Sequence, residues 1–139
     1  TRANDWRNFI FQTVLGETEV IIYDNPGMEK YWNVTKKMIQ KSDAFVLFTG
    51  VGKNSIKRLQ FWIDQIHDIS NDPLLFIAIT HIDDKWEKTL EEFQAFADEK
   101  KAKIFVISWY DLDKIDLMFN QIADDLGSIT FDKYYASYI

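Results

Sequence analysis

Residues 74–79 read Leu-Leu-Phe-Ile-Ala-Ile, and residues 80–83, directly after them, read Thr-His-Ile-Asp. The first run is wholly apolar, which is typical of a strand buried on both faces of a parallel sheet. The turn residues Asn71-Asp72-Pro73 come just before the run and mark its start. We therefore predict a buried parallel strand whose carboxyl end carries polar residues.

Two further apolar runs, at residues 44–48 and 104–107, flank this strand in the sequence. Within residues 55–69, apolar residues recur at three- and four-residue intervals, which predicts an amphipathic helix between the first two runs. A capping box from Thr89 to Glu92 predicts the start of another helix before the last run. This alternation favours right-handed crossovers and a parallel sheet with helices on both faces.

The beginning of the chain predicts a hairpin. Residues 9–15 and 19–23 are β-rich runs separated by Gly16-Glu17-Thr18, so we expect an antiparallel pair of strands with its turn at these three residues. Apolar residues at roughly helical spacing then predict a short helix over residues 29–41.

The end of the chain predicts a last helix over residues 113–126, which Gly127 ends, and a C-terminal tail over residues 127–139. Residues 1–139 are too few for two ordinary domains, so we expect a single domain with one core. The predicted fold class is α/β, in three layers, with a mostly parallel sheet and one antiparallel hairpin.

Composition excludes several classes of function. The chain has 16 Lys+Arg against 22 Asp+Glu, a net charge of -6, and its basic residues are scattered, so we expect no nucleic-acid partner. It has no cysteine, which rules out disulfides and thiolate metal sites. No apolar run approaches the roughly 18 residues that span a bilayer. We expect a cytoplasmic chain without direct membrane insertion, peripheral to membranes only through partners.

Polar residues follow three of the predicted strands. They are Asp24-Asn25-Pro26-Gly27 after the hairpin, Thr80-His81-Ile82-Asp83 after the 74–79 strand, and Ser108-Trp109-Tyr110 after the last strand. In open α/β sheets the ligand crevice lies at the carboxyl ends of the strands. The three segments are therefore the candidate functional site.

The three segments resemble motifs of the Rab/Ras-type small GTPases. Asp24-x-x-Gly27 is similar to the D-x-x-G element, residues 80–83 occupy the place of N-K-x-D, and Ser108 that of S-A-K. Their order and spacing, with a hairpin leading into the first motif, resemble this family up to about Leu126. The resemblance implies a small-GTPase-like fold and these candidate nucleotide-binding residues: Asp24, Gly27, Thr80, Asp83 and Ser108.

The family implies a role for each motif. An aspartate like Asp24 holds magnesium through water when a nucleotide is bound, and the backbone N–H of a residue like Gly27 approaches the γ-phosphate. An acid like Asp83 accepts N–H groups from a guanine edge. A second interpretation of Asp24 stays open, because Asp-Asn-Pro-Gly is a turn sequence without any ligand.

The chain departs from the family at several of these positions. Met28 replaces the glutamine that orients the attacking water, so hydrolysis is expected to be impaired and no catalytic residue is predicted. Thr80 and His81 replace the asparagine and lysine of the base pocket, which puts guanine specificity in doubt. Met28 and Trp32 are predicted as contacts in the switch region.

The phosphate loop of the family is not found in its usual place. It precedes the hairpin in the family, and only eight residues precede Phe9. Residues 50–55, Gly-Val-Gly-Lys-Asn-Ser, follow a strand and open a helix, but Leu47 stands where the first glycine belongs and Asn54 where Ser or Thr belongs. We predict an ordinary turn there, with Asn54 or Ser55 capping the helix.

Three hypotheses of function follow. The first is a degenerate Rab/Ras-like GTPase domain, a protein-interaction or regulatory module with little or no hydrolysis by this chain alone and no cofactor; its partners are proteins or a neighbouring GTPase domain, as in a tandem Rab-like protein. The alternative is a GTP-hydrolysing vesicle-traffic switch that uses GTP/GDP and Mg²⁺ and whose phosphate loop lies outside these residues. The third is a receiver-like signalling domain. Whether the chain is a fragment stays open.

Overall fold

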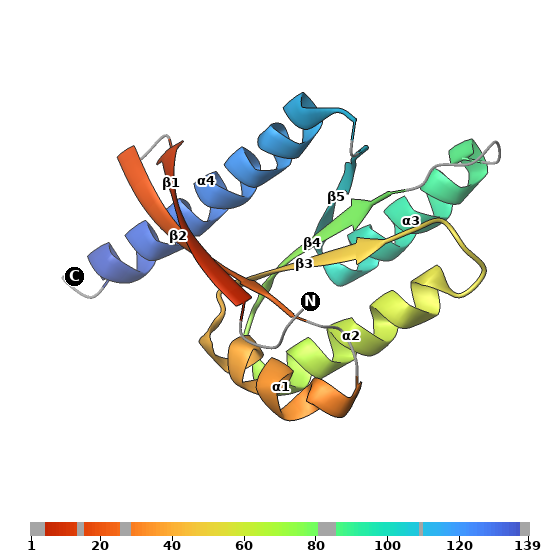
Figure 1. The fold of residues 1–139 in the computed structure, drawn as a ribbon, viewed down its shortest axis with the longest axis horizontal. Helices are drawn as coiled ribbons and strands as arrows, with labels where there is room; N and C mark the ends of the chain where they lie inside the picture. Colours follow the sequence, from red (N-terminus) through yellow and green to blue (C-terminus); the bar gives the residue numbers. More distant parts are fainter. Residues whose placement is uncertain (1–4, 14–15, 26–28, 81–85, 109, 137–139) are drawn as a thin grey trace. The chain divides into compact units, whose positions relative to one another are not determined.

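The computed structural model describes residues 5–13, 16–25, 29–80, 86–108 and 110–136. The chain divides into two compact units, one of residues 43–116 and one of residues 1–42 with residues 117–139. Figure 1 shows the elements in their order along the chain.

The unit of residues 43–116 is built on a parallel sheet. Strands β3 (Ala44–Thr49), β4 (Leu74–Ile79) and β5 (Ala102–Val106) lie side by side in that order. Residues 75–79 of β4 are at most 3% exposed, because β4 has a strand on each side and apolar residues on both faces. The predicted buried parallel strand is confirmed.

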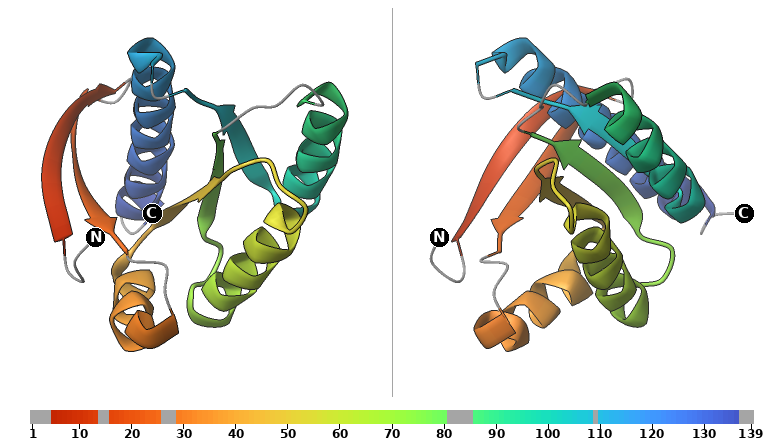
Figure 2. Two further views of the ribbon diagram at one scale, coloured as in Figure 1. Left: turned by 45° about the vertical axis from the view of Figure 1, so that its right-hand side comes forward. Right: turned by 90° about the vertical axis from the view of Figure 1, so that its right-hand side faces the viewer.

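Two helices connect these strands. Helix α2 (Ser55–Ile69) joins β3 to β4, and helix α3 (Trp86–Lys100) joins β4 to β5. Both crossovers advance in the same direction along the sheet, so right-handed connections place both helices on one face of it, and the views of Figure 2 agree with this placement. Leu59, Ile63 and Ile66 of α2 are buried, as its apolar spacing predicted.

The start of α3 differs from the prediction. The helix begins at Trp86, three residues before Thr89, so Thr89 lies within the helix and is not its cap. Glu87 and Lys88 favour a helix, and no glycine or proline stops it from extending toward the amino terminus. Phe93 and Ala97 of this helix are buried.

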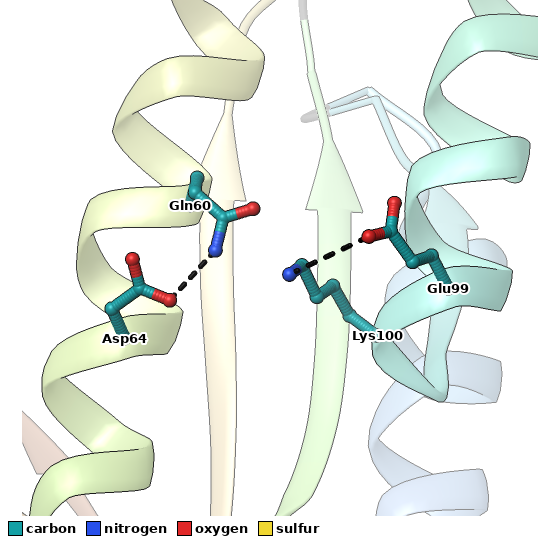
Figure 3. A network of polar contacts seen from close by, with 4 residues as sticks. All are labelled: Gln60, Asp64, Glu99 and Lys100. Atoms are coloured by element: carbon teal, nitrogen blue, oxygen red, sulfur yellow. Dashed lines mark hydrogen bonds and ion pairs between the residues drawn. The ribbon is translucent and has the colours of Figure 1, made fainter.

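Each of these two helices carries a polar pair, and Gln60 and Lys100 point into the space between the helices (Figure 3). On α2, Gln60 Nε2 donates a hydrogen bond of 2.7 Å to Asp64 Oδ1, and on α3, Lys100 Nζ lies 3.9 Å from Glu99 Oε1. Exposed pairs of this kind contribute about 0.2–1 kcal/mol each. The stability of the unit therefore comes chiefly from its buried apolar faces.

The second unit contains the predicted antiparallel hairpin. Strands β1 (Asp5–Thr13) and β2 (Gly16–Asp24) pair in register from Asp5 with Asp24 to Thr13 with Gly16. The predicted position of the turn is wrong, because Gly16, Glu17 and Thr18 are the first residues of β2. Thr18 is β-branched and suits a strand, and Thr13 Oγ1 lies 3.1 Å from Thr18 Oγ1 across the ladder.

The remaining helices are a short 3-10 turn (Glu29–Tyr31) followed by α1 (Trp32–Lys41), and α4 (Leu112–Ala136). The first two match the predicted helix over residues 29–41. The predicted end of the last helix is wrong, since α4 passes through Gly127. A glycine inside a helix costs only about 1 kcal/mol relative to alanine, and Gly127 is buried, so the packing of the helix outweighs that cost.

The fold class is confirmed as α/β, with a parallel sheet and an antiparallel hairpin, in agreement with a small-GTPase-like fold. The ladders of the described residues form two separate sheets, β1-β2 and β3-β4-β5. None of the helices in the described part of the chain is long and apolar enough to cross a membrane.

Candidate functional site

The carboxyl edge of the parallel sheet holds two of the predicted site residues. Thr80 follows β4, and its backbone N–H donates a 2.8 Å hydrogen bond to the carbonyl of Thr49 at the end of β3. Ser108 comes after β5, where the N–H of Ile107 donates to the carbonyl of Ile79 at 3.0 Å. Thr80 and Ser108 thus lie beyond the ends of adjacent strands, and their role in nucleotide binding stays a prediction.

Thr80 is held inside the protein at this edge. It is 6% exposed, and its Oγ1 donates a 3.3 Å hydrogen bond to the same Thr49 carbonyl that accepts its backbone N–H. A hydroxyl has a single proton to donate. The hydroxyl proton of Thr80 is therefore used to join the ends of β3 and β4.

Ser108 lies in a different environment. It is exposed, its Oγ accepts a 3.3 Å hydrogen bond from the N–H of Tyr110, and its carbonyl accepts one of 3.0 Å from the N–H of Asp111. These bonds shape the turn that leads from β5 into α4. Among the residues that the structure describes, no acceptor takes the proton of the Ser108 hydroxyl.

The other predicted residues either lie in the second unit or fall outside the described residues. Asp24 is the last residue of β2 and is exposed, and Trp32 is the first residue of α1 and is half-buried. Gly27, Met28 and Asp83 lie outside the described residues. Asp24 and Thr80 belong to different units.

The glycine-containing loop before α2 is closed upon itself. Ser55 is 9% exposed, and its Oγ accepts a 2.9 Å hydrogen bond from the N–H of Gly52 and donates one of 2.8 Å to the carbonyl of Gly50. Asn54 occupies the cap position but makes no capping hydrogen bond with its side chain. A phosphate cradle needs free backbone N–H groups, and the N–H of Gly52 is taken. The loop closes on itself in this way, which agrees with the ordinary turn that we predicted.

A hollow of about 330 Å³ lies beside this loop, between the end of β3 and the first turns of α2. Sequence reasoning missed it, because the apolar residues within 55–69 indicated only the face of an amphipathic helix. One signal in the sequence marks the place: residues 44–63 hold no Asp or Glu although the chain is acidic overall. The hollow is lined by Leu47, Phe48, Thr49, Gly50, Val51, Gly52, Ser55, Arg58, Leu59 and Trp62.

Acidic and histidine side chains do not gather into a metal site within the residues that the structure describes. The magnesium role of Asp24 was predicted only through water and only with a bound nucleotide. It therefore stays a prediction for this exposed carboxylate.

Comparisons with known proteins find similarity to Ras-related proteins. Residues 8–128 match the family model described as the Ras family. Among curated proteins, the chain is similar to the Ras-related protein Rab-24 of Dictyostelium discoideum, with 28% identity over 122 residues, which cover 82% of this chain and 60% of that protein. The chain thus spans less than two thirds of the length of this relative.

Proposed function

The chain belongs to the Ras family, and we propose that it is a degenerate Rab/Ras-like GTPase domain that acts as a protein-interaction or regulatory module. By itself it hydrolyses little or no nucleotide. Its partners are other proteins or a neighbouring GTPase domain.

The environment of Thr80 is the observation that supports this proposal best. In the family, the asparagine of N-K-x-D ties the base-binding loops together, and the lysine after it covers the ring of the base. Here Thr80 is buried and donates its hydroxyl proton to Thr49, and the next residue is His81. The groups that recognise a guanine are thus reduced to the acid at position 83.

Two further features agree with weak nucleotide binding. The loop at residues 50–55 uses the Gly52 N–H and the Ser55 hydroxyl for its own closure. Met28 stands at the position of the water-orienting glutamine, and a thioether is only a weak hydrogen-bond acceptor and no donor. Binding and hydrolysis are therefore both expected to be impaired.

Titration with fluorescent GTP and GDP analogues in the presence of Mg²⁺ tests the proposal. We expect no saturable binding up to about 1 mM, which corresponds to a binding free energy weaker than roughly -4 kcal/mol. Micromolar or tighter binding by this chain would refute the module hypothesis. In that case the Asp24→Asn and Asp83→Asn variants show whether the predicted residues carry the binding.

The alternative function is a GTP-hydrolysing vesicle-traffic switch, and the position of Asp24 favours it. Asp24 is exposed at the end of β2, and the D-x-x-G spacing to Gly27 is intact. This function requires a glycine-rich Lys-Ser/Thr loop, so its test is single-turnover hydrolysis by a polypeptide that carries such a loop before Thr1. Hydrolysis that the Asp24→Asn variant abolishes would establish the switch.

A further inference from the structure

We propose that the hollow between β3 and α2 is a docking site for a second copy of this chain, which inserts Leu112 from the start of its α4. The proposal names a partner for the interaction role proposed above and rests on that role. Two surfaces of the same unit carry it: the hollow, and the acidic segment of residues 111–116.

The hollow is open, and polar and apolar groups line it together, with two aromatic side chains among them. Phe48 is 53% exposed at the end of β3, and Trp62 is half-buried on α2. Phe61, 45% exposed, contacts Trp62 edge-on with ring centroids 5.4 Å apart and extends the apolar surface. Exposed aromatic side chains around a concave site are the usual composition of an anchor pocket in a protein interface.

One cation, Arg58, lines the hollow, and the segment that forms it is basic in an acidic protein. Residues 44–63 contain Lys53, Lys57 and Arg58 and no acidic residue, a local charge of +3, whereas the whole chain carries -6, so the remaining residues carry -9. All three cations are exposed. Within the described part of the chain, none of them belongs to an ion pair. An acidic surface with an apolar anchor complements this site.

The start of α4 presents such an anchor. Leu112 is 69% exposed, and the acids Asp111, Asp113 and Asp116 lie within four positions of it, with Lys114 as the one cation of the segment. Residues 111–116 therefore carry a net charge of -2 beside an exposed leucine. Asp113 is exposed and occupies the first turn of the helix, from which it can reach a cation of a partner.

Both surfaces lie at the same edge of the sheet. The hollow follows β3, α4 follows β5, and these parallel strands both end at the carboxyl edge. Two copies that face each other with this edge can exchange the contact, each Leu112 entering the hollow of the other copy. Such a reciprocal contact closes a two-fold dimer and does not propagate into a fibre.

Sedimentation velocity over a concentration series tests the dimer. Because the contact surface is small, we expect a weak dimer with a dissociation constant on the order of 10–100 µM. Arg58→Asp and Asp113→Arg should each weaken it about tenfold, since a like-charge pair replaces an opposite one. Leu112→Ser should weaken it by a similar factor through loss of the anchor.

Charge exchange gives the sharpest test. A mixture of the Arg58→Asp and Asp113→Arg variants should dimerise again, because each variant supplies the charge that the other requires. Lys37→Asp, an equal change of charge at an exposed position of α1, is the control for charge. Leu117→Ser is the control for the anchor, since Leu117 is 67% exposed and lies five positions further along the same helix.

Two results would overturn the proposal. One is a chain that stays monomeric up to about 1 mM, the dissociation constant that corresponds to a binding free energy of roughly -4 kcal/mol. The other is a dimer that these variants do not weaken. An acidic peptide of unrelated sequence that binds the hollow while the chain stays monomeric assigns the site to another partner and also refutes it. The nucleotide titration is independent of these results, so failure of the dimer and failure of the module hypothesis can be told apart.

Discussion

Strands β4 and β1 are both rich in apolar residues, but they lie in opposite environments. Residues 75–79 of β4 are at most 3% exposed, whereas Trp6, Phe9 and Ile10 of β1 are 59%, 44% and 70% exposed. β4 pairs with a strand on each side, while β1 pairs only with β2 among the described residues. Apolar composition thus favours a strand in both places, and the number of neighbours decides how much of its surface leaves water.

This difference sets how much each region contributes to stability. Burial of apolar surface contributes about 25 cal/mol for each Å² removed from water. The fully buried side chains Phe76, Ile77 and Phe93 belong to the unit of residues 43–116. Matched substitutions in β4 and β1 therefore measure the contrast directly.

The largest effect is expected for Phe76→Ala. Phe76 is fully buried and lies 6.1 Å, between ring centroids, from Phe105 of β5. Removing a buried phenylalanine side chain costs about 3–5 kcal/mol, because its contacts are lost and a cavity remains. Urea unfolding followed by circular dichroism measures the loss. Phe9→Ala is the matched control and should cost less than half as much; equal losses in the two variants would contradict the contrast.

The sequence predicted the elements whose burial pattern is strong. Leu74–Ile79 and Ser55–Ile69 are found with the predicted bounds, because a wholly apolar strand and a long amphipathic helix each leave one way to bury their side chains. The errors lie at the ends of elements. Gly127 is a stop signal by composition, but it lies inside α4, where packing outweighs local preference. Gly16 is the first residue of β2, and its φ of 106° is one that glycine adopts readily.

Within the candidate site, the sequence predicted positions better than contacts. Thr80 and Ser108 lie at the carboxyl edge because that edge follows from the order of the strands. The hydrogen bond from Thr80 to Thr49 joins residues 31 positions apart, so no local sequence pattern predicts it. The hollow at Trp62 was missed for a related reason: helical spacing shows which side of a helix faces inward, but not whether the neighbouring strand fills the space.

An intermediate effect is expected for Ser55→Ala, within the buried unit but at a polar group. Loss of the Ser55 hydroxyl leaves the N–H of Gly52 without its acceptor and the carbonyl of Gly50 without its donor. Losing hydrogen bonds of this kind costs about 0.5–1.5 kcal/mol each. Ser128→Ala, which removes an exposed hydroxyl bonded to the carbonyl of Asp124, is the control and should change the urea midpoint little. A Ser55→Ala variant as stable as that control would show that the loop does not depend on its serine.

The smallest effect is expected for Ile10→Thr, which makes the same chemical change in the hairpin as Ile77→Thr makes in β4. Ile10 is 70% exposed, and threonine favours strands, so the free energy of unfolding should change by no more than about 0.5 kcal/mol. Ile77 is fully buried, so Ile77→Thr places a hydroxyl among apolar side chains and should cost about 1–3 kcal/mol. Urea midpoints of the two variants give the comparison. If Ile10→Thr destabilises the protein as strongly as Ile77→Thr, then the exposed face of the hairpin is covered in solution, and the contrast between β1 and β4 disappears.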